Sequence, residues 1–448
     1  MIIKFKNLGP IENGEIDLND LKGINLIIGK NNTGKTYLSN LLYTYFKVRE
    51  RQNIKMDEVV GIRFKDRLSD SDYETIKDYF EKKYEKEIKD TLPQVFHTSK
   101  DTFKDFEIEV NLSDEILEFK KLDDDTIIYF REMRKTIKLK KFEDKIEYLM
   151  EDYDENKGKR YITYNRKIEE EEAKQIIFGY FLHIKFFQKI YKFYSFPAER
   201  SGAVLFYKQL LEERSDVLRE LELGNSENIG KISRYSEPVN DYVKFLNSIS
   251  DRSKGLTELD IYKKLDTELK EILGGEVIID LEGNIMFRMN EKKIIDIGMV
   301  SSTVKTLTGF YLYLKYFAME RDIIFIDEIE LNLHPENQRK IMKLINYLSK
   351  QGIKFIISTH SPIITEEIDN MLLFEKVKDK INSEEMKEYG INSEYGLKTS
   401  DINVFHLHNK TVEKIKEKNG EFEIETFNTV LEETDNLYQT LLFYAEEK

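Results

Sequence analysis

The chain has 448 residues, of which 40% are hydrophobic and 34% are charged, and its formal net charge is −14. This length allows one large globular domain with an insertion, or two to three domains, and the acidic balance argues against a uniformly basic surface for nucleic acid while leaving room for a local basic patch. The sequence has no cysteine, which excludes disulfides and thiolate metal sites, and no run approaching the roughly 20 apolar residues of a membrane span, so we expect a cytoplasmic protein without membrane contact.

Apolar segments near the N-terminus predict strands. Ile2–Phe5 and Gly14–Leu18 read as a hairpin, and Ile24–Ile28 reads as a buried strand. A glycine-rich segment follows that strand directly, and a helix is predicted from Lys35 to Phe46. This strand, loop and helix order is the setting in which phosphate-binding loops occur.

The glycine-rich segment, Gly-Lys-Asn-Asn-Thr-Gly-Lys-Thr, has the complete pattern Gly-x-x-x-x-Gly-Lys-Thr. Its glycines let backbone N–H groups point at a β-phosphate, and the helix that follows adds its positive N-terminus. Lys35 can reach the β- and γ-phosphate oxygens, while the hydroxyl of Thr36 can hold Mg²⁺. We therefore expect ATP and Mg²⁺ as cofactors, with the nucleotide contacted by Gly29, Asn31, Asn32, Thr33, Gly34, Lys35 and Thr36.

Residues 48–190 form a looser pattern of charged helical stretches and short strands, such as Phe106–Val110 and Thr126–Phe130, and we interpret them as an insertion. A helix is predicted to open at Glu169–Glu172 and to run through aromatic residues around Phe186 that suit core packing. A basic stretch could contact phosphates or an acidic partner, or it could form a solvated face; it comprises Arg131, Arg134, Lys135, Lys138, Lys140 and Lys141.

Helical patterns dominate residues 191–275, with helices predicted over Tyr207–Leu223 and Val239–Ile249. Before them, the segment Tyr194–Ala198 ends in the turn Pro-Ala-Glu-Arg-Ser-Gly. In this turn Arg200 is either an internal charge partner or a trigger that reads the nucleotide state.

In residues 276–448, a hairpin of Glu276–Asp280 with Asn284–Arg288 leads to Ser301-Ser302-Thr303 and an apolar helix over Val304–Phe317. No heptad pattern persists over three repeats, so we expect no long coiled-coil arm.

Two further apolar strands end in groups that suit nucleotide hydrolysis. Ile323–Ile326 precedes Asp327 and Glu328, the form of a Walker B segment in which the aspartate holds Mg²⁺ and the glutamate polarises the attacking water. Lys354–Ile357 leads to His360, which could contact a γ-phosphate from the carboxyl end of its strand. We therefore predict catalytic roles for Glu328, His360 and Lys35, and metal binding by Thr36 and Asp327.

The order of these motifs resembles an ABC-type ATPase head of the SMC, RecF and OLD kind, and within that group the short anti-phage defence ATPases such as PtuA of Septu systems and AriA of PARIS systems. Four segments carry the resemblance, namely Phe5–Ile11, Gly29–Thr36, Asp327–Pro335 and Ser358–Pro362. It implies an α/β fold with a mixed sheet core, antiparallel N-terminal strands, a long insertion and a helical lobe. The expected division is an N-terminal ATPase lobe 1–47, the insertion 48–190, the helical lobe 191–275 and a C-terminal ATPase lobe 276–448.

The resemblance also implies that two heads sandwich two ATP molecules, each closed by the signature helix of the other subunit. Here that helix would begin at Ser301 and Ser302, whose hydroxyls and N–H groups can bind a γ-phosphate or can simply cap the helix. Thr303 stands where relatives usually have glycine, and Lys305 stands where they often have arginine. Slow turnover is therefore expected.

We therefore expect a homodimeric or larger ATPase that senses or scaffolds, and controls a separately encoded effector nuclease or toxin in anti-phage defence. OLD proteins often carry a nuclease domain with an Asp-x-Asp pair, and none follows His360. His406 and His408 lie on one strand face without an evident third ligand, which favours a structural role. One alternative is a RecF-like DNA-maintenance ATPase acting directly on DNA. A transporter's nucleotide-binding subunit is disfavoured because no Leu-Ser-Gly-Gly-Gln segment is present.

Overall fold

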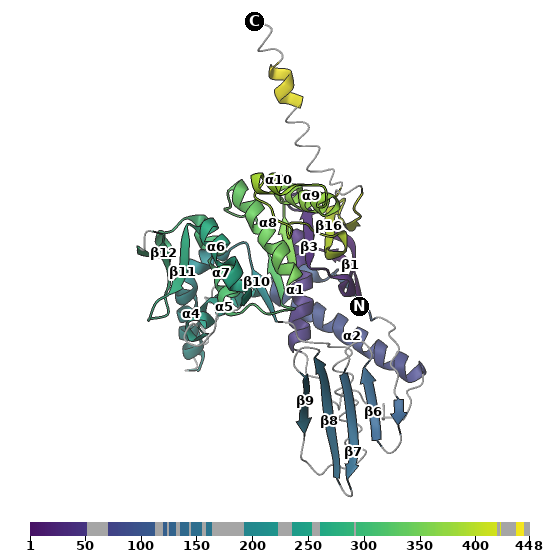
Figure 1. Ribbon diagram of the computed structural model, residues 1–448. Coiled ribbons are helices and arrows are strands. Elements are labelled where there is room, and N and C mark those ends of the chain that lie inside the picture. Colours follow the sequence, from purple (N-terminus) through teal and green to yellow (C-terminus); the bar gives the residue numbers. More distant parts are fainter. Residues whose placement is uncertain are drawn as a thin grey trace. The chain divides into compact units, whose positions relative to one another are not determined.

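The structure, a computed structural model, describes the backbone of residues 1–51, 70–112, 120–122, 125–130, 135–142, 145–154, 158–163, 192–222, 235–252, 260–290, 293–418, 422 and 436–442. The chain divides into two compact units (Figure 1). One unit consists of Met1–Ile2, Lys47–Glu87 and Glu109–Ile190, and the other consists of Ile3–Phe46, Ile88–Ile108 and Tyr191–Lys448.

The largest element is a nine-stranded mixed sheet in the order β10-β14-β15-β3-β16-β17-β2-β1-β4. Strands β10, β14, β15, β3 and β16 run parallel, and β16 turns back into β17 as an antiparallel hairpin. The strands are β1 (Ile2–Leu8), β2 (Ile11–Asp17), β3 (Ile24–Gly29), β4 (Glu107–Asn111), β10 (Phe193–Phe196), β14 (Ile323–Ile326), β15 (Lys354–Thr359), β16 (Ile402–His408) and β17 (Thr411–Ile415). The fold class is therefore the α/β class that we predicted.

The central parallel strands bring the sequence motifs to one edge of the sheet. β15 lies between β14 and β3, with Ile357 opposite Ile326 on one side and Thr359 opposite Ile28 on the other. All residues of β14 and β3 are buried, which explains their continuous apolar runs. Since parallel strands end at the same edge, the loops after β3, β14 and β15 converge there.

Helices and a small sheet accompany the large sheet. Helices α4, α5, α6 and α7 contact one another, and α8 packs on β3 and β15. The helices are α1 (Lys35–Arg51), α4 (Arg200–Glu222), α5 (Glu237–Arg252), α6 (Asp260–Leu273), α7 (Ser302–Tyr316), α8 (Pro335–Lys350), α9 (Pro362–Val377) and α10 (Ser383–Glu388). The small antiparallel sheet consists of β11 (Gly275–Ile279), β12 (Ile285–Met289) and β13 (Ile294–Asp296), with Glu276 opposite Arg288 as the predicted hairpin requires.

An aromatic cluster fixes β10 against the helices. The ring of Phe196, at the end of β10, lies 5.8 Å from that of Tyr242 on α5 and 5.7 Å from that of Phe310 on α7. Both contacts are edge-to-face, the geometry that aromatic quadrupoles favour. The end of β10 is therefore anchored at the sheet edge where the motif loops converge.

Gly309 on α7 allows the close approach of Tyr242, and Gly309→Ala is expected to destabilise the protein. An added Cβ would lie 2.2 Å from the Tyr242 hydroxyl, so the fully buried side chain of Tyr242 would have to shift. Overpacking of this kind typically costs about 1–3 kcal/mol. We expect a lower urea midpoint for Gly309→Ala in equilibrium unfolding. Gly202→Ala on α4 is the matched control, because nothing lies within 4 Å of its added Cβ. An unchanged midpoint for Gly309→Ala would contradict this packing.

The unit that includes Glu109–Ile190 contains a five-stranded antiparallel sheet in the order β5-β6-β7-β8-β9. Its strands are β5 (Lys120–Leu122), β6 (Asp125–Phe130), β7 (Lys135–Phe142), β8 (Lys145–Asp154) and β9 (Gly158–Thr163), and helix α2 spans Asp70–Val95. The predicted strand Thr126–Phe130 is thus confirmed as β6. The predicted helix from Glu169 lies outside the described residues, as do Arg131 and Arg134 of the basic stretch.

Four lysines of the basic stretch belong to β7, where the backbone register places two of them opposite acids. Lys135 pairs with Asp152 and Lys140 pairs with Glu147 on β8. The two interpretations of the basic stretch both stay predictions.

Among the described helices, none combines the length and the hydropathy that crossing a membrane requires.

Candidate nucleotide-binding site

The loop between β3 and α1 has the backbone that a phosphate cradle needs. Gly34 has φ +106°, and a Cβ added there would lie 2.7 Å from Cγ1 of Ile11. A Cβ on Gly29 would lie 2.7 Å from the carbonyl oxygen of Leu407 on β16. Only glycine fits these two positions without displacement of the neighbours. Between them, Asn31 and Asn32 are exposed.

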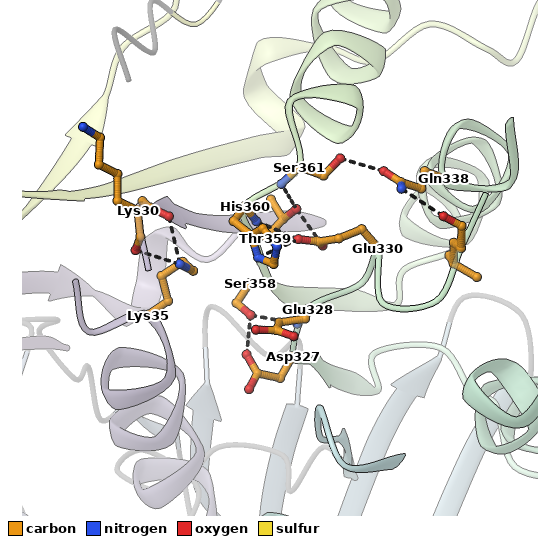
Figure 2. A network of polar contacts seen from close by, with 12 residues as sticks. Lys30, Lys35, Asp327, Glu328, Glu330, Gln338, Ser358, Thr359, His360 and Ser361 are labelled. Atoms are coloured by element: carbon orange, nitrogen blue, oxygen red, sulfur yellow. Dashed lines mark hydrogen bonds and ion pairs between the residues drawn. The ribbon is translucent and has the colours of Figure 1, made fainter. Parts of the chain in front are cut away.

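The ammonium of Lys35 lies within the curve of this loop. Lys35 is the first residue of α1, and its ammonium donates hydrogen bonds to the carbonyl oxygens of Gly29, at 2.8 Å, and Lys30, at 2.9 Å (Figure 2). Burial lowers the pKa of Lys35, and the negative charges of Glu328, Glu330 and Asp327 oppose that shift. Acids at the ends of neighbouring segments therefore lie close enough to act on the lysine charge.

Ser358 joins the two acids that follow β14. Its hydroxyl donates a hydrogen bond to the carboxylate of Asp327 and accepts one from the backbone N–H of Glu328, at 2.9 Å. Both acidic residues are partly exposed, whereas Ser358 is buried near the end of β15. The serine therefore fixes Asp327 from the side of the sheet and leaves the acids accessible.

Glu328 has an unusual backbone conformation. Its φ is +48°, in the left-handed region that residues with a Cβ rarely occupy. Such a conformation costs on the order of 1–3 kcal/mol and persists only where the surroundings hold it. Here the Ser358 hydroxyl binds the N–H of Glu328, and the guanidinium of Arg200 binds its carbonyl oxygen at 2.7 Å.

Glu330 orients His360. The buried carboxylate of Glu330 accepts hydrogen bonds from the hydroxyl of Thr359 and from the backbone N–H of His360, both at 2.8 Å. Nδ1 of His360 lies 3.0 Å from the same carboxylate (Figure 2). The imidazole is 43% exposed, so the ring is accessible to a ligand.

The described residues fit a magnesium nucleotide. The loop N–H groups, the Lys35 ammonium, the exposed Thr36 hydroxyl and the Asp327 carboxylate supply the donor and oxygen groups that triphosphate and Mg²⁺ require. When bound, Mg²⁺ would be held by Thr36 and Asp327 and would neutralise part of the phosphate charge.

Comparison with known families agrees with this geometry. A model described as "AAA ATPase domain" matches residues 1–365, most of the chain. The chain belongs to the AAA ATPase domain family. Nucleotide binding by this AAA ATPase therefore follows both from its family and from the loop that its sequence forms.

Solved SMC head domains are also similar to this AAA ATPase. The SMC head domain from Thermotoga maritima is 11% identical and has a TM-score of 0.27, with 93% of this chain and 98% of that chain covered. An Smc head bound to the C-terminal winged-helix domain of ScpA is 10% identical, with coverage of 95% and 98% and a TM-score of 0.33. The Smc head with an extended coiled coil, bound to the C-terminal domain of ScpA from Pyrococcus furiosus, is 11% identical, with coverage of 97% and 98% and a TM-score of 0.31. At these TM-scores the similarity carries no argument about activity or partners.

Ser301 and Ser302 lie at the exposed start of α7 in this AAA ATPase. Ser301 is the N-cap, and its hydroxyl accepts a hydrogen bond from the N–H of Val304 at 3.4 Å. The hydroxyl of Thr303 donates to the carbonyl oxygen of Asn332 at 2.7 Å. The threonine that replaces the usual glycine thus ties the first turn of α7 to the segment after Glu328. Binding of a partner's nucleotide by the two serines stays a prediction.

His406 and His408 lie on one face of β16, as predicted, and their rings stack at 4.7 Å. His406 is buried, and Nε2 of His408 lies 2.7 Å from the carboxylate of Glu413 on β17. Within the described parts of the chain, no group of three or more His, Cys, Asp or Glu residues could hold a metal ion.

From the sequence, two roles were open for Arg200, and no role was predicted for Ser358 or Glu330. The guanidinium of Arg200 binds backbone carbonyl oxygens at the site rather than a carboxylate. The sequence does contain Ser358, two residues before His360, and Glu330, two residues after Glu328. Their hydrogen-bond partners lie on the neighbouring strand or the loop after it, so they depend on the pairing of β14 with β15.

Proposed function

We propose that this AAA ATPase hydrolyses ATP with Mg²⁺ and that two copies pair through their ATPase heads around the nucleotide. The observation that carries the proposal is the meeting of Lys35, the Asp327–Glu328 pair and His360 at one edge of the parallel strands. In this assignment Lys35 binds phosphate oxygens, Asp327 and Thr36 hold the metal, and Glu328 polarises water.

Each group has a role that its surroundings support. Glu328 is partly exposed and oriented by hydrogen bonds on both sides of its backbone, which suits a general base that must reach a water molecule. His360 is held beside Glu330 through its backbone N–H, and its imidazole is partly exposed at the end of β15. Ser301 and Ser302 would contribute to the nucleotide bound by the partner copy, because they are exposed at a helix N-terminus that favours anions.

In the cell, we assign this ATPase a sensor or scaffold role in anti-phage defence, in which head pairing controls a separately encoded effector nuclease or toxin. The proposal draws on the motif resemblance to short defence ATPases. Direct action on DNA is the RecF-like alternative, and the basic stretch would be its candidate contact with phosphates. Salt-sensitive DNA binding by the purified chain would favour that alternative.

Ser302→Arg tests the pairing of heads. The new side chain would enter the space assigned to the partner's γ-phosphate, so we expect ATP-dependent association to be lost while binding of ATP to the single chain is retained. Light scattering with and without Mg-ATP measures association, and fluorescent-nucleotide titration measures binding. Ser393→Arg makes the same substitution at an exposed serine in the segment after α10 and is the matched control, which should keep ATP-dependent association. Persistent association of Ser302→Arg would remove Ser302 from the interface.

A further inference from the structure

Arg200 is almost completely buried, with 2% of its surface exposed, and three of its hydrogen bonds go to backbone carbonyl oxygens. Nη1 donates to Pro197, at 3.0 Å, and to Asp327, at 2.6 Å. Nη2 donates to Glu328 at 2.7 Å. One planar guanidinium therefore spans the two consecutive carbonyls of the acidic pair, a geometry that a lysine ammonium cannot reproduce.

The topology explains how this residue reaches the site. β10 pairs in parallel with β14, so that Phe196 lies opposite Ile326 and the ladder continues from the N–H of Asp327 to the carbonyl of Phe196 at 3.0 Å. Arg200 follows β10 at the first position of α4. The aromatic packing of Phe196 on Tyr242 and Phe310 fixes the end of that strand.

Arg200 donates its hydrogen bond to the carbonyl of Glu328, the residue whose backbone is in the left-handed conformation. The carbonyl of Glu328 accepts hydrogen bonds from Arg200 and from the N–H of Leu331, at 3.0 Å, and the N–H of Glu328 donates to the hydroxyl of Ser358. The Arg200 bond is the one that reaches this carbonyl from another segment of the chain, so its loss would weaken the hold on the left-handed conformation and would let the glutamate side chain turn away from its present direction.

We propose that Arg200 is a positioning residue for ATP hydrolysis, which holds Glu328 in its left-handed conformation and thereby aims the carboxylate at the attacking water. This inference rests on the proposed ATPase function. Arg200 acts through the backbone of Glu328 and is too buried to be assigned a phosphate contact. Its charge also lies near Asp327, Glu328 and Glu330, so the experiment has to separate the fork geometry from the charge.

Arg200→Lys keeps a positive charge but loses the planar guanidinium that binds the carbonyl oxygens of Asp327 and Glu328 together. We expect kcat for ATP to fall about 10- to 100-fold, whereas the Kd for fluorescent ATP and the KM should stay within about threefold of wild type. Arg339→Lys on α8, whose guanidinium pairs with Glu367, is the matched control and should keep wild-type turnover. Wild-type kcat in Arg200→Lys would show that charge alone suffices and would overturn the positioning role.

Arg200→Ala provides a second, independent test. Added guanidinium ions at low millimolar concentration should restore part of kcat in this variant, whereas ethylammonium at the same concentration should not. Restoration by both ions, or by neither, would contradict the proposal. Loss of ATP binding in both variants would also contradict it, because Arg200 would then serve the stability of the site. If the wild-type chain itself does not hydrolyse ATP, the proposed function fails, and this result is distinct from every outcome above.

Discussion

Glu328→Gln is expected to bind Mg-ATP as the wild-type protein does and to hydrolyse it about 10²- to 10⁴-fold more slowly, the usual effect of losing a general base. Glutamine keeps the shape of the side chain. The backbone contacts with Ser358 and Arg200 involve main-chain atoms, so they should survive the substitution. Asp327 keeps its carboxylate and its bond from Ser358.

Slow turnover in Glu328→Gln should also lengthen the life of the ATP-bound pair of heads. Hydrolysis and ATP-dependent association should be measured in the same preparation. Glu336→Gln is the control, because Glu336 is an exposed carboxylate on α8 that forms an ion pair with Lys340 one turn further along the same helix. Wild-type turnover in Glu328→Gln would show that Glu328 is not the base. Normal binding without stabilised association would refute the paired-head mechanism.

The core strands of the site were predictable because parallel strands that are buried on both faces read as nearly continuous apolar runs. Ile24–Ile28, Ile323–Ile326 and Lys354–Ile357 were all found as strands, and each is followed by the polar group that the sequence singled out. Several boundaries moved by a few residues. The helix after the phosphate loop runs to Arg51 instead of Phe46, because the change from helix to insertion carries no proline or glycine.

The long-range neighbours were not predictable from local pattern. Nothing in the segment around Phe193–Phe196 indicates that it pairs with β14, far away in the sequence, and this pairing is what brings Arg200 to Asp327 and Glu328. The same holds for β16, which lies beside β3 and crowds Gly29. The division of the chain at residues 47, 190 and 275 stays a prediction.

Glu330 illustrates the same limit within a short motif. Its place in the sequence, two residues after Glu328, suggested only that it belonged to the catalytic segment. Its bonds to Thr359 and His360 depend on the neighbouring strand β15. A sequence motif names the residue types at a site, whereas the hydrogen bonds between motifs follow from strand order.

Lys35→Ala is expected to weaken ATP binding by at least about 100-fold, because hydrogen bonds to charged groups contribute about 1.5–3 kcal/mol each and the ammonium can reach more than one phosphate oxygen. In the structure the ammonium binds the carbonyl oxygens of Gly29 and Lys30, bonds that phosphate oxygens would replace. The matched control is Lys30→Ala in the same loop, since the Lys30 side chain is exposed. It should bind ATP with nearly wild-type affinity.

The thermal stability of Lys35→Ala distinguishes a binding defect from a folding defect. Burial lowers the pKa of Lys35, which means that the charged ammonium loses favourable hydration in the folded protein. Replacing this side chain should therefore lower the Tm of the nucleotide-free protein only slightly. A ligand that binds only the folded state raises Tm in proportion to RT ln(1 + [L]/Kd), so wild type and Lys30→Ala should be stabilised by Mg-ATP while Lys35→Ala should not. An equal ATP-dependent rise in all three proteins would mean that Lys35 does not bind the phosphates. That result would remove the nucleotide from this loop and, with it, the basis for the roles of Asp327, Glu328 and His360.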